Sequence, residues 1–306
     1  MPFTTTAELG DTIPTIIEKA LLTSQFNAVM AGLCWNKDKR NRAGSTVNLP
    51  YFGEVTAHVL TEGIDMTSSE TMEDTNVQIT LNEVGTKIIL TDNALEDDQE
   101  EVKSIAGKIL GQAMEKKRDL DLIEQMDDAT NTLAGASTTL TMGHLAAAKA
   151  LLAGNATSAG GPAPMPYVCV IHPFQTLDLV DVLTPIVAGT VTAAAGTSTI
   201  AAWQSIGTAF TDDIIRNYGI GRLFGMNIIE DGNIPNETGT SDKKGGVFSM
   251  GEGGGIVLAT ARDWDVRPER DESLRGWELN CVGRYGVGEY MAGWIVELYS
   301  DATTPA

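Results

Sequence analysis

The chain has 306 residues, and 41 acidic side chains against 21 basic ones give it a formal charge of −20. A hydrophobic content of 42 % supplies enough apolar side chains for packed cores, which excludes an intrinsically disordered chain. A surface this acidic repels the phosphate backbone, so broad nucleic-acid binding through lysine and arginine contacts is excluded as well.

Residues 1–42 are expected to form an N-terminal arm. The arm ends in the densest basic run of the chain, Asn36–Arg42, with four bases in seven residues. Such a run is usually a solvated tether, and we prefer that interpretation. The alternative is a contact with an acidic surface on another copy of the chain, or with nucleic acid.

The next stretch, Gly44–Leu90, is expected to form a two-stranded ribbon around a polar tip. Apolar and polar residues alternate along Val55–Leu60 and again along Val77–Asn82, as they do in half-buried strands. After Glu83 the apolar residues move to even positions, which predicts a bulge or a change of buried face. The tip, Glu62–Thr75, has almost nothing to bury, and an isolated ribbon is barely stable in water. We therefore expect another subunit to supply the surface that covers the ribbon.

Residues Asn93–Asn131 are expected to form one long helix. Apolar residues recur at intervals of three and four between Val102 and Met126, and Glu96, three residues after Asn93, resembles a capping box. At a rise of about 1.5 Å per residue this helix is roughly 58 Å long. Because its apolar stripe is narrow, we expect it to lie along a flat surface as a strut. The alternative is a long helix in an ordinary α+β domain.

Shorter elements follow the long helix. The segment Gly154–Pro166, rich in glycine, alanine and proline, is the best candidate for a domain boundary. Asp231–Gly246 is expected to be a polar loop. The uncharged stretch Val182–Thr211 is poor in leucine, so we expect no membrane span. Helices are expected at Met142–Leu152, Phe174–Leu183 and Asp212–Tyr218, and strands at Tyr167–His172, Leu223–Glu230, Ile256–Ala259, Trp277–Val282 and Trp294–Tyr299.

The motifs for catalysis, metal binding and cofactor binding that we tested are all incomplete. Gly219, Gly221 and Gly225 precede a predicted strand, whereas the glycines of a dinucleotide fingerprint follow one. Cys169 and His172 fall on opposite faces of a strand, which is wrong for a nucleophile and its base. The three cysteines show neither a disulfide framework nor zinc spacing, which indicates a reducing compartment. We expect no enzyme activity, no catalytic residue, no metal and no cofactor.

The order of these parts resembles the major capsid proteins of tailed bacteriophages, the Hong Kong 97 fold family. Val59–Asp65 is similar to the family's extended loop, where Glu-Gly precedes the tip. Ile88–Asp97 looks like the entry to its spine helix, and Leu223–Pro235 looks like a strand of its axial domain. The resemblance extends from Gly44 to Tyr299, and the order of the motifs carries it.

The resemblance implies an α+β fold of the Hong Kong 97 type. Such a fold has an N-arm, an extended β-hairpin loop, a peripheral domain with a long spine helix, and an axial α/β domain. The implied domains are the arm at 1–42, the extended loop at 43–87, the peripheral domain at 88–155, the axial domain at 156–244, and strands at 245–306 that return to the peripheral domain, with the last strand in either domain.

The implied function is that of a structural major capsid protein, which self-assembles into hexamers and pentamers of an icosahedral phage head around double-stranded DNA. The DNA is bound without sequence specificity, and no membrane or cofactor is involved. Implied partners are other copies of the chain, a portal and a decoration protein. Because the chain begins almost at the arm, scaffolding is expected from a separate protein. The implied location is the virion, after assembly in the host cytoplasm.

The extended loop is acidic, so we expect it to dock on basic residues of a neighbouring copy. Each exposed ion pair contributes only about 0.2–1 kcal/mol, but a shell repeats it many times. Some family members cross-link a loop lysine to a neighbour's asparagine, and residues 43–86 contain no lysine, so we expect no such bond. The loop acids are Glu54, Glu62, Asp65, Glu70, Glu73, Asp74 and Glu83, and the candidate basic partners are Lys37, Lys39, Arg40, Arg42, Lys116, Lys117, Arg118 and Arg284.

Two alternatives remain open at this point. An encapsulin-type compartment shares the fold and encloses a cargo enzyme, although the basic arm favours the viral interpretation. A soluble α/β enzyme or binding module with a long helix belongs to a different class, and it would be a monomer or dimer in solution.

Overall fold

A computed structural model of the chain describes residues 28–40, 44–53, 55–66, 69–72, 74–96, 102–127, 129–154, 161–183, 221–236 and 242–302. The chain divides into two units, Met1–Gln125 with Ile256–Tyr290 and Met126–Gly255 with Met291–Ala306. The division falls at Met126, inside a helix, and not in the Gly154–Pro166 segment that the sequence favours as a boundary. The reason is that residues just after the helix supply a strand and a helix to the second unit.

The first unit contains a four-stranded sheet with the order β1-β10-β11-β4. Strand β1 pairs with β10 in parallel, and the other neighbours are antiparallel. The strands expected at Ile256–Ala259 and Trp277–Val282 are confirmed, but both are much longer. The extension of β10 carries charged side chains and runs past its partner β1, and the extension of β11 is rich in glycine, so neither extension shows an apolar pattern in the sequence. The strands are β1 (Trp35–Asp38), β4 (Asn82–Thr91), β10 (Ile256–Asp271) and β11 (Gly276–Glu289).

The described residues of the predicted long helix lie in α1 (Asp92–Glu96) and α2 (Val102–Asp127), and residues 97–101 are outside the described ranges. Helix α2 has 26 residues and is therefore about 39 Å long. It ends before Asn131 because that residue begins a strand. The expected cap at Asn93 is wrong, since Asn93 lies inside α1 and the Thr91 hydroxyl accepts a hydrogen bond from the amide of Ala94 at 3.4 Å.

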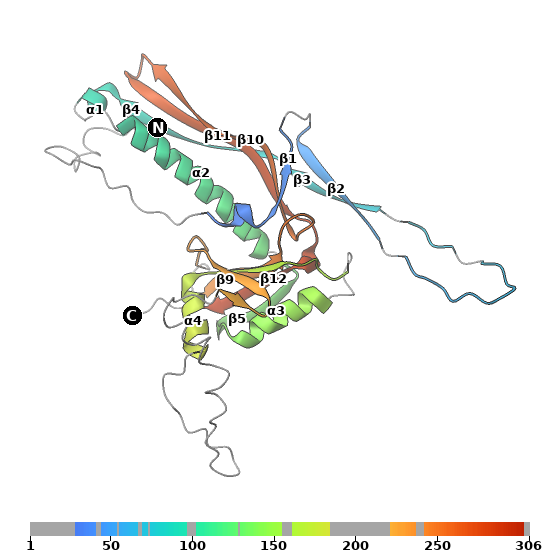
Figure 1. The fold of residues 1–306 in the computed structure, drawn as a ribbon. Coiled ribbons are helices and arrows are strands. Elements are labelled where there is room, and N and C mark those ends of the chain that lie inside the picture. Colours follow the sequence, from blue (N-terminus) through green and yellow to red (C-terminus); the bar gives the residue numbers. More distant parts are fainter. Residues whose placement is uncertain are drawn as a thin grey trace, which may run out of the picture. The chain divides into compact units, whose positions relative to one another are not determined.

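Helix α2 lies along the sheet, which confirms the expected strut (Figure 1). Its buried residues Ala106, Leu110 and Met114 share one core with Leu90 of β4 and Leu279 of β11. This packing holds the helix parallel to the long hairpin formed by β10 and β11.

A separate two-stranded ribbon consists of β2 (Thr46–Phe52) and β3 (Asp74–Thr80). The outgoing strand is therefore not Val55–Leu60, as its alternation predicts, because pairing stops at Phe52 opposite Asp74. The root of the ribbon packs on the four-stranded sheet, where its buried residues are Leu49, Ile79 and Leu81 against Val257 and Ala259.

The predicted change of buried face is confirmed at Leu81. Strand β3 ends at Thr80 and β4 begins at Asn82, and the pairing partner changes there from β2 to β11. The amide of Leu81 donates to the carbonyl of Ser45 at 2.8 Å, which holds the chain at this crossing.

The second unit is built on a six-stranded sheet with the order β5-β12-β9-β6-β8-β7. Every residue of β6 is buried, so this strand lies in the core of the unit. Helix α3 lies against β5, β9 and β12. The elements are β5 (Asn131–Thr139), α3 (Met142–Gly154), β6 (Tyr167–Ile171), α4 (Pro173–Leu183), β7 (Arg222–Leu223), β8 (Met226–Glu230), β9 (Asp242–Ser249) and β12 (Ile295–Asp301), with short 3-10 turns at Met30–Gly32 in the first unit and Ala292–Trp294 in the second.

Two predictions for this unit are wrong in detail. The strand expected at Leu223–Glu230 is a tight hairpin, with Phe224 and Gly225 at positive φ in its turn. The polar loop expected to reach Gly246 ends earlier, because β9 begins at Asp242. Lys243 of β9 is buried, and its ammonium donates a hydrogen bond to the carbonyl of Ile234 at 3.2 Å. The helix expected at 212–218 lies outside the described residues. Within those residues, no helix has the length and apolar character needed to cross a bilayer.

Candidate inter-subunit surface

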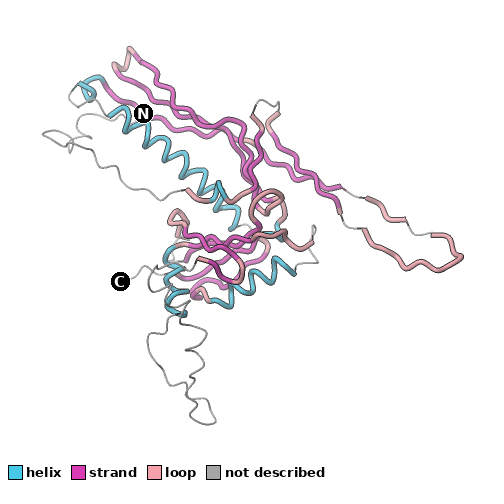
Figure 2. The backbone as a smooth tube through the Cα atoms, viewed as in Figure 1, coloured by secondary structure: helices cyan, strands magenta, loops and turns pink. Residues whose placement is uncertain are grey.

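The ribbon continues as a connecting loop, residues 53–73, whose described residues have no regular secondary structure (Figure 2). All of its described residues are exposed. Six apolar side chains of the loop are between 62 and 99 % exposed, and three of them lie in the tip, Glu62–Thr75, so the expectation that the tip has almost nothing to bury is wrong. Burying one such side chain contributes roughly 1.5–3 kcal/mol. These residues are Val55, Val59, Leu60, Ile64, Met66 and Met72.

The loop is held in shape by two local contacts. His58 and Glu70 form a 2.8 Å contact between the outgoing and returning halves of the loop. At the far end, the amide of Ile64 donates to the carbonyl of Thr61 at 3.2 Å, and Gly63 has a φ of 83°. A turn with positive φ at its third residue requires glycine or asparagine there, which is the type II signature. The tip is therefore a preformed turn.

The structure does not gather the acidic residues predicted for the loop into one cluster. Glu70 contacts His58, and Glu83 lies on β4, where Arg262 binds it at 2.6 Å. Glu62 and Asp65 have no ion-pair partner among the described residues, and the same holds for Asp74 at the start of β3. Glu54 and Glu73 lie outside the described residues.

Most of the candidate basic residues are already engaged within their own subunit. Lys37 lies 4.1 Å from the centre of the Trp35 ring, and Arg118 lies 4.3 Å from that of Trp264. The remaining contacts are those of Lys39 with the carbonyl of Thr46, Arg40 with Asp38 and Asp263, and Lys117 with Asp121 at 2.5 Å. Arg42 lies outside the described residues. Among the described part of the chain, Lys116 and Arg284 are the two candidates that have no ion pair, ring contact or side-chain hydrogen bond.

Arg284 faces a basic hollow of about 450 Å³ at the root of the ribbon. In the strand register Arg284 of β11 lies directly opposite Arg262 of β10 on one side and Glu83 of β4 on the other. Like charges opposite each other across strands are destabilising. The hollow is lined by the cations Lys39, Arg262 and Arg284, the carboxylate Glu83, and the apolar side chains of Leu81 and Ala261. Sequence reasoning missed Arg262, because only the register of the strands brings it beside Arg284.

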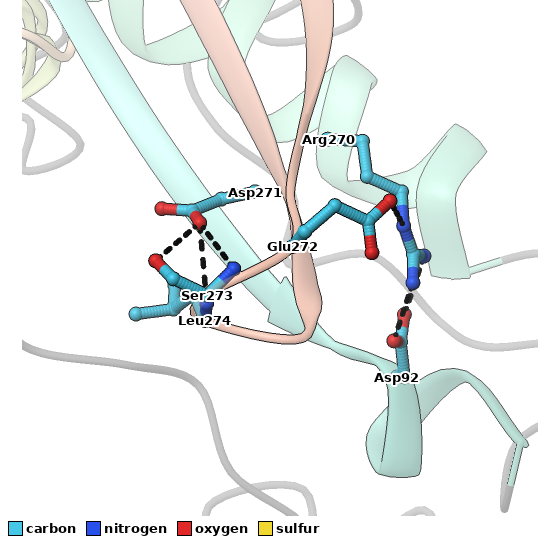
Figure 3. Close-up of polar contacts among 6 residues, drawn as sticks. All are labelled: Asp92, Arg270, Asp271, Glu272, Ser273 and Leu274. Atoms are coloured by element: carbon cyan, nitrogen blue, oxygen red, sulfur yellow. Dashed lines mark hydrogen bonds and ion pairs between the residues drawn. The ribbon is translucent and has the colours of Figure 1, made fainter.

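The far end of the β10–β11 hairpin is fixed by a polar cluster (Figure 3). Arg270 binds both carboxylate oxygens of Asp92 at 2.9 Å and Glu272 at 3.0 Å, and its hydrogen bond to Asp92 is the main reason that its pKa is raised. Asp271 accepts hydrogen bonds from the hydroxyl and amide of Ser273 and the amide of Leu274, which lower the pKa of Asp271. The cluster ties the hairpin turn to helix α1.

The second unit contains buried polar groups with structural contacts. Cys169 is fully buried in β6, which raises the pKa of its thiol to about 12. The ring of His172 accepts a hydrogen bond from the amide of Phe174 at 3.1 Å. The side-chain amide of Gln175 donates to Ser300 at 2.7 Å and joins α4 to β12. Across the described ranges, His, Cys, Asp and Glu side chains do not gather in threes as a metal site.

The fold matches solved phage structures over nearly its full length. Similar chains include one from Mycobacterium phage Che8 (16 % identity, TM-score 0.67, 94 % of this chain and 96 % of that one covered) and one from the head of Helicobacter pylori bacteriophage KHP40 (10 %, 0.70, 99 % and 99 %). A third is the capsid of a native GTA particle (12 %, 0.64, 98 % and 100 %). At these identities the likeness shows the shared fold alone.

Sequence comparison identifies the family. No curated protein sequence matches the chain. Residues 74–296, which cover 223 of the 306 positions, match the family described as phage capsid protein. The match spans both units and includes the returning half of the ribbon, the strut helix and the long hairpin. The chain therefore belongs to the phage capsid protein family and is a structural major capsid protein.

Proposed function

We propose that copies of this capsid protein assemble into hexamers and pentamers, which close an icosahedral head around double-stranded DNA. The observation that carries the proposal is the connecting loop, whose six apolar side chains are exposed. A concentration of exposed apolar side chains in one loop indicates a site of protein association. In a shell, the loop of each subunit lies on the next subunit and its apolar residues become buried.

The two units correspond to the two domains of such a shell protein. We assign the unit with the strut helix and long hairpin as the peripheral domain, and the unit with the six-stranded sheet as the axial domain. Residues 1–42 then form the arm and residues 43–87 the extended loop. This arrangement assigns β12, the last strand, to the axial domain.

The remaining partners follow from the same role. A head needs a portal, a separate scaffolding protein during assembly in the host cytoplasm, and in some cases a decoration protein on its outer surface. The packaged DNA is held without sequence-specific contacts, in keeping with a chain of charge −20. Family membership favours a virion over an encapsulin-type compartment.

Electron microscopy of the purified full-length chain tests the proposal, with light scattering for particle mass. Shells are expected, and nuclease-protected DNA inside particles from infected cells distinguishes a phage head from a container of cargo enzyme. A monomer or dimer at all concentrations contradicts the proposal.

A loop variant tests the observation directly. Replacing Ile64, Met66 and Met72 with serine is expected to leave folded, soluble subunits that form no shells, because each loses roughly 1.5–3 kcal/mol of burial per side chain at the contact. Met165→Ser is the matched control, since Met165 is 71 % exposed in the other unit. Normal shells from the triple variant would show that the apolar side chains of the loop do not hold the subunits together.

A further inference from the structure

The basic hollow at the root of the ribbon is an incomplete ion-binding site. Glu83 binds Arg262 at 2.6 Å and leaves the positive charge of Arg284 without a partner among the described residues. Lys39 donates one of its three ammonium hydrogens to the carbonyl of Thr46, which leaves two for a further acceptor. With three cations and one carboxylate, the hollow has an excess positive charge in a strongly acidic protein.

The strand register makes this excess charge unfavourable while the hollow is empty. Arg262 and Arg284 lie directly opposite each other on β10 and β11, and such a pair repels. A register irregularity on both sides of Arg262 leaves the hairpin uneven at this point. A carboxylate placed between the two guanidinium groups would relieve the repulsion and accept hydrogen bonds from both.

The tip of the connecting loop has the complementary chemistry. Glu62 occupies the second position of the turn Thr61–Ile64, where its carboxylate is exposed and has no partner among the described residues. Ile64, two residues on, is 70 % exposed. The turn is preformed by Gly63, so little conformational freedom is lost when it binds. One carboxylate and one apolar side chain therefore project from a single rigid turn.

We propose that the turn Thr61–Ile64 of one copy binds in the basic hollow of a neighbouring copy, with the Glu62 carboxylate between Arg262 and Arg284 and Ile64 against Ala261. This inference rests on the proposed shell function, and it identifies the binding site of the loop on the neighbouring copy. The cationic lining fits an acidic side chain, and the half-buried Ala261 offers a contact to its apolar neighbour. A nucleic-acid phosphate would use the cations and leave Ala261 without an apolar contact.

A charge exchange tests the pairing. Glu62→Arg and Arg284→Glu are each expected to raise the subunit concentration at which shells appear by roughly tenfold or more, since each converts an attraction into a repulsion. Combining the two is expected to restore assembly toward that of the wild-type chain. Arg284→Glu places an acid opposite Arg262 on one side and opposite Glu83 on the other, so the two effects offset each other and the subunit should stay folded. Thermal unfolding of the subunits checks this. Lys116→Glu is the matched control, as Lys116 is the other basic candidate with no side-chain partner among the described residues.

Three results of this exchange would overturn the proposal. One is normal assembly of Arg284→Glu at wild-type concentration. Another is rescue of Glu62→Arg by Lys116→Glu instead of by Arg284→Glu, which would seat the loop on helix α2. The third is an Arg284→Glu chain that forms normal shells in infected cells but packages less DNA, which would assign the hollow to phosphate.

Disulfide cross-linking tests the docking of the turn independently of whether shells form. In the full chain, Glu62→Cys combined with Arg284→Cys is expected to give bands of linked chains on non-reducing gels after mild oxidation, whereas each single variant gives monomer bands. The three native cysteines are buried and so do not interfere. Linked chains without shells by microscopy would uphold the docking and refute the proposed head. Monomer bands alone, from particles that are shells, would refute the docking and leave the head intact.

Discussion

Gly286 is a position where a single methyl group should misplace the ribbon that carries the loop. A Cβ at Gly286 of β11 would collide with the backbone carbonyl of Thr80 at the end of β3. Two residues on, a Cβ at Gly288 would meet only the side chain of Ile79, with the nearest carbon at 3.1 Å. Backbone cannot move aside without shifting the ribbon, whereas an isoleucine side chain can rotate, so the two glycines form a matched pair.

The size of the effect follows from two opposing contributions. Alanine gains about 0.5–1 kcal/mol over glycine in a strand, because glycine loses more chain entropy on folding. Forcing an atom into filled space costs about 1–3 kcal/mol, and the rigid obstacle at Gly286 puts the cost at the upper end. Gly286→Ala should therefore destabilise the first unit by about 2 kcal/mol, and Gly288→Ala by close to zero. In a unit of this size about 2 kcal/mol corresponds to a Tm lower by roughly 4–8 °C.

Thermal unfolding of soluble subunits, followed by circular dichroism, measures the difference between the two variants. Electron microscopy then shows whether Gly286→Ala subunits that remain folded still close into shells, and fewer shells are expected because the ribbon root is displaced. Equal Tm values for the two variants would refute the reasoning that backbone contact at Thr80 fixes the ribbon.

Two further predictions concern pH and covalent linkage. Burial, with a smaller contribution from the charge of Lys243, lowers the pKa of His172 to about 4, whereas a histidine in an unfolded chain titrates near 6.5. Below pH 6.5 the unfolded chain therefore binds the extra proton, so the free energy of unfolding should fall by about 2 kcal/mol between pH 7 and pH 5. Urea unfolding should show a smaller loss of unfolding free energy between pH 7 and pH 5 in His172→Gln than in the unchanged chain. The loss should be the same as in the unchanged chain for His58→Gln, the control at an exposed residue. An equal loss in all three chains would refute the role of His172. Boiled, reduced particles should run as monomer bands, since residues 43–86 contain no lysine for an isopeptide bond, and a ladder of linked bands would contradict this.

Periodic segments were predictable from sequence because the spacing of their apolar residues follows the geometry of the helix or strand itself. Helix α2 shows its stripe between Val102 and Met126, and β6 shows its continuous apolar run, and both are present. The strand predicted from the alternation at Val55–Leu60 is not formed, and the reason is physical. An alternating segment forms a strand only if a partner strand lies beside it, and among the described residues of the subunit this segment has none.

The contacts of the charged residues could not be predicted, because they depend on register and on distant segments. Nothing near Arg118 in the sequence indicates that Trp264 covers it, and nothing near Arg284 indicates that Arg262 faces it. The exposed apolar residues of the loop were visible in the sequence. Their significance appears only when the structure shows that their own subunit leaves Val59 and Ile64 uncovered.

The placement of β12 has a consequence for biogenesis. This strand lies between β5 and β9, so the six-stranded sheet stays split until residues 295–301 have left the ribosome. Until then β5 and β9 each present an open edge, and such edges attract other strands. Closure of the sheet thus waits for the synthesis of β12, and a nascent chain that still lacks this strand cannot present a finished building block to its neighbours.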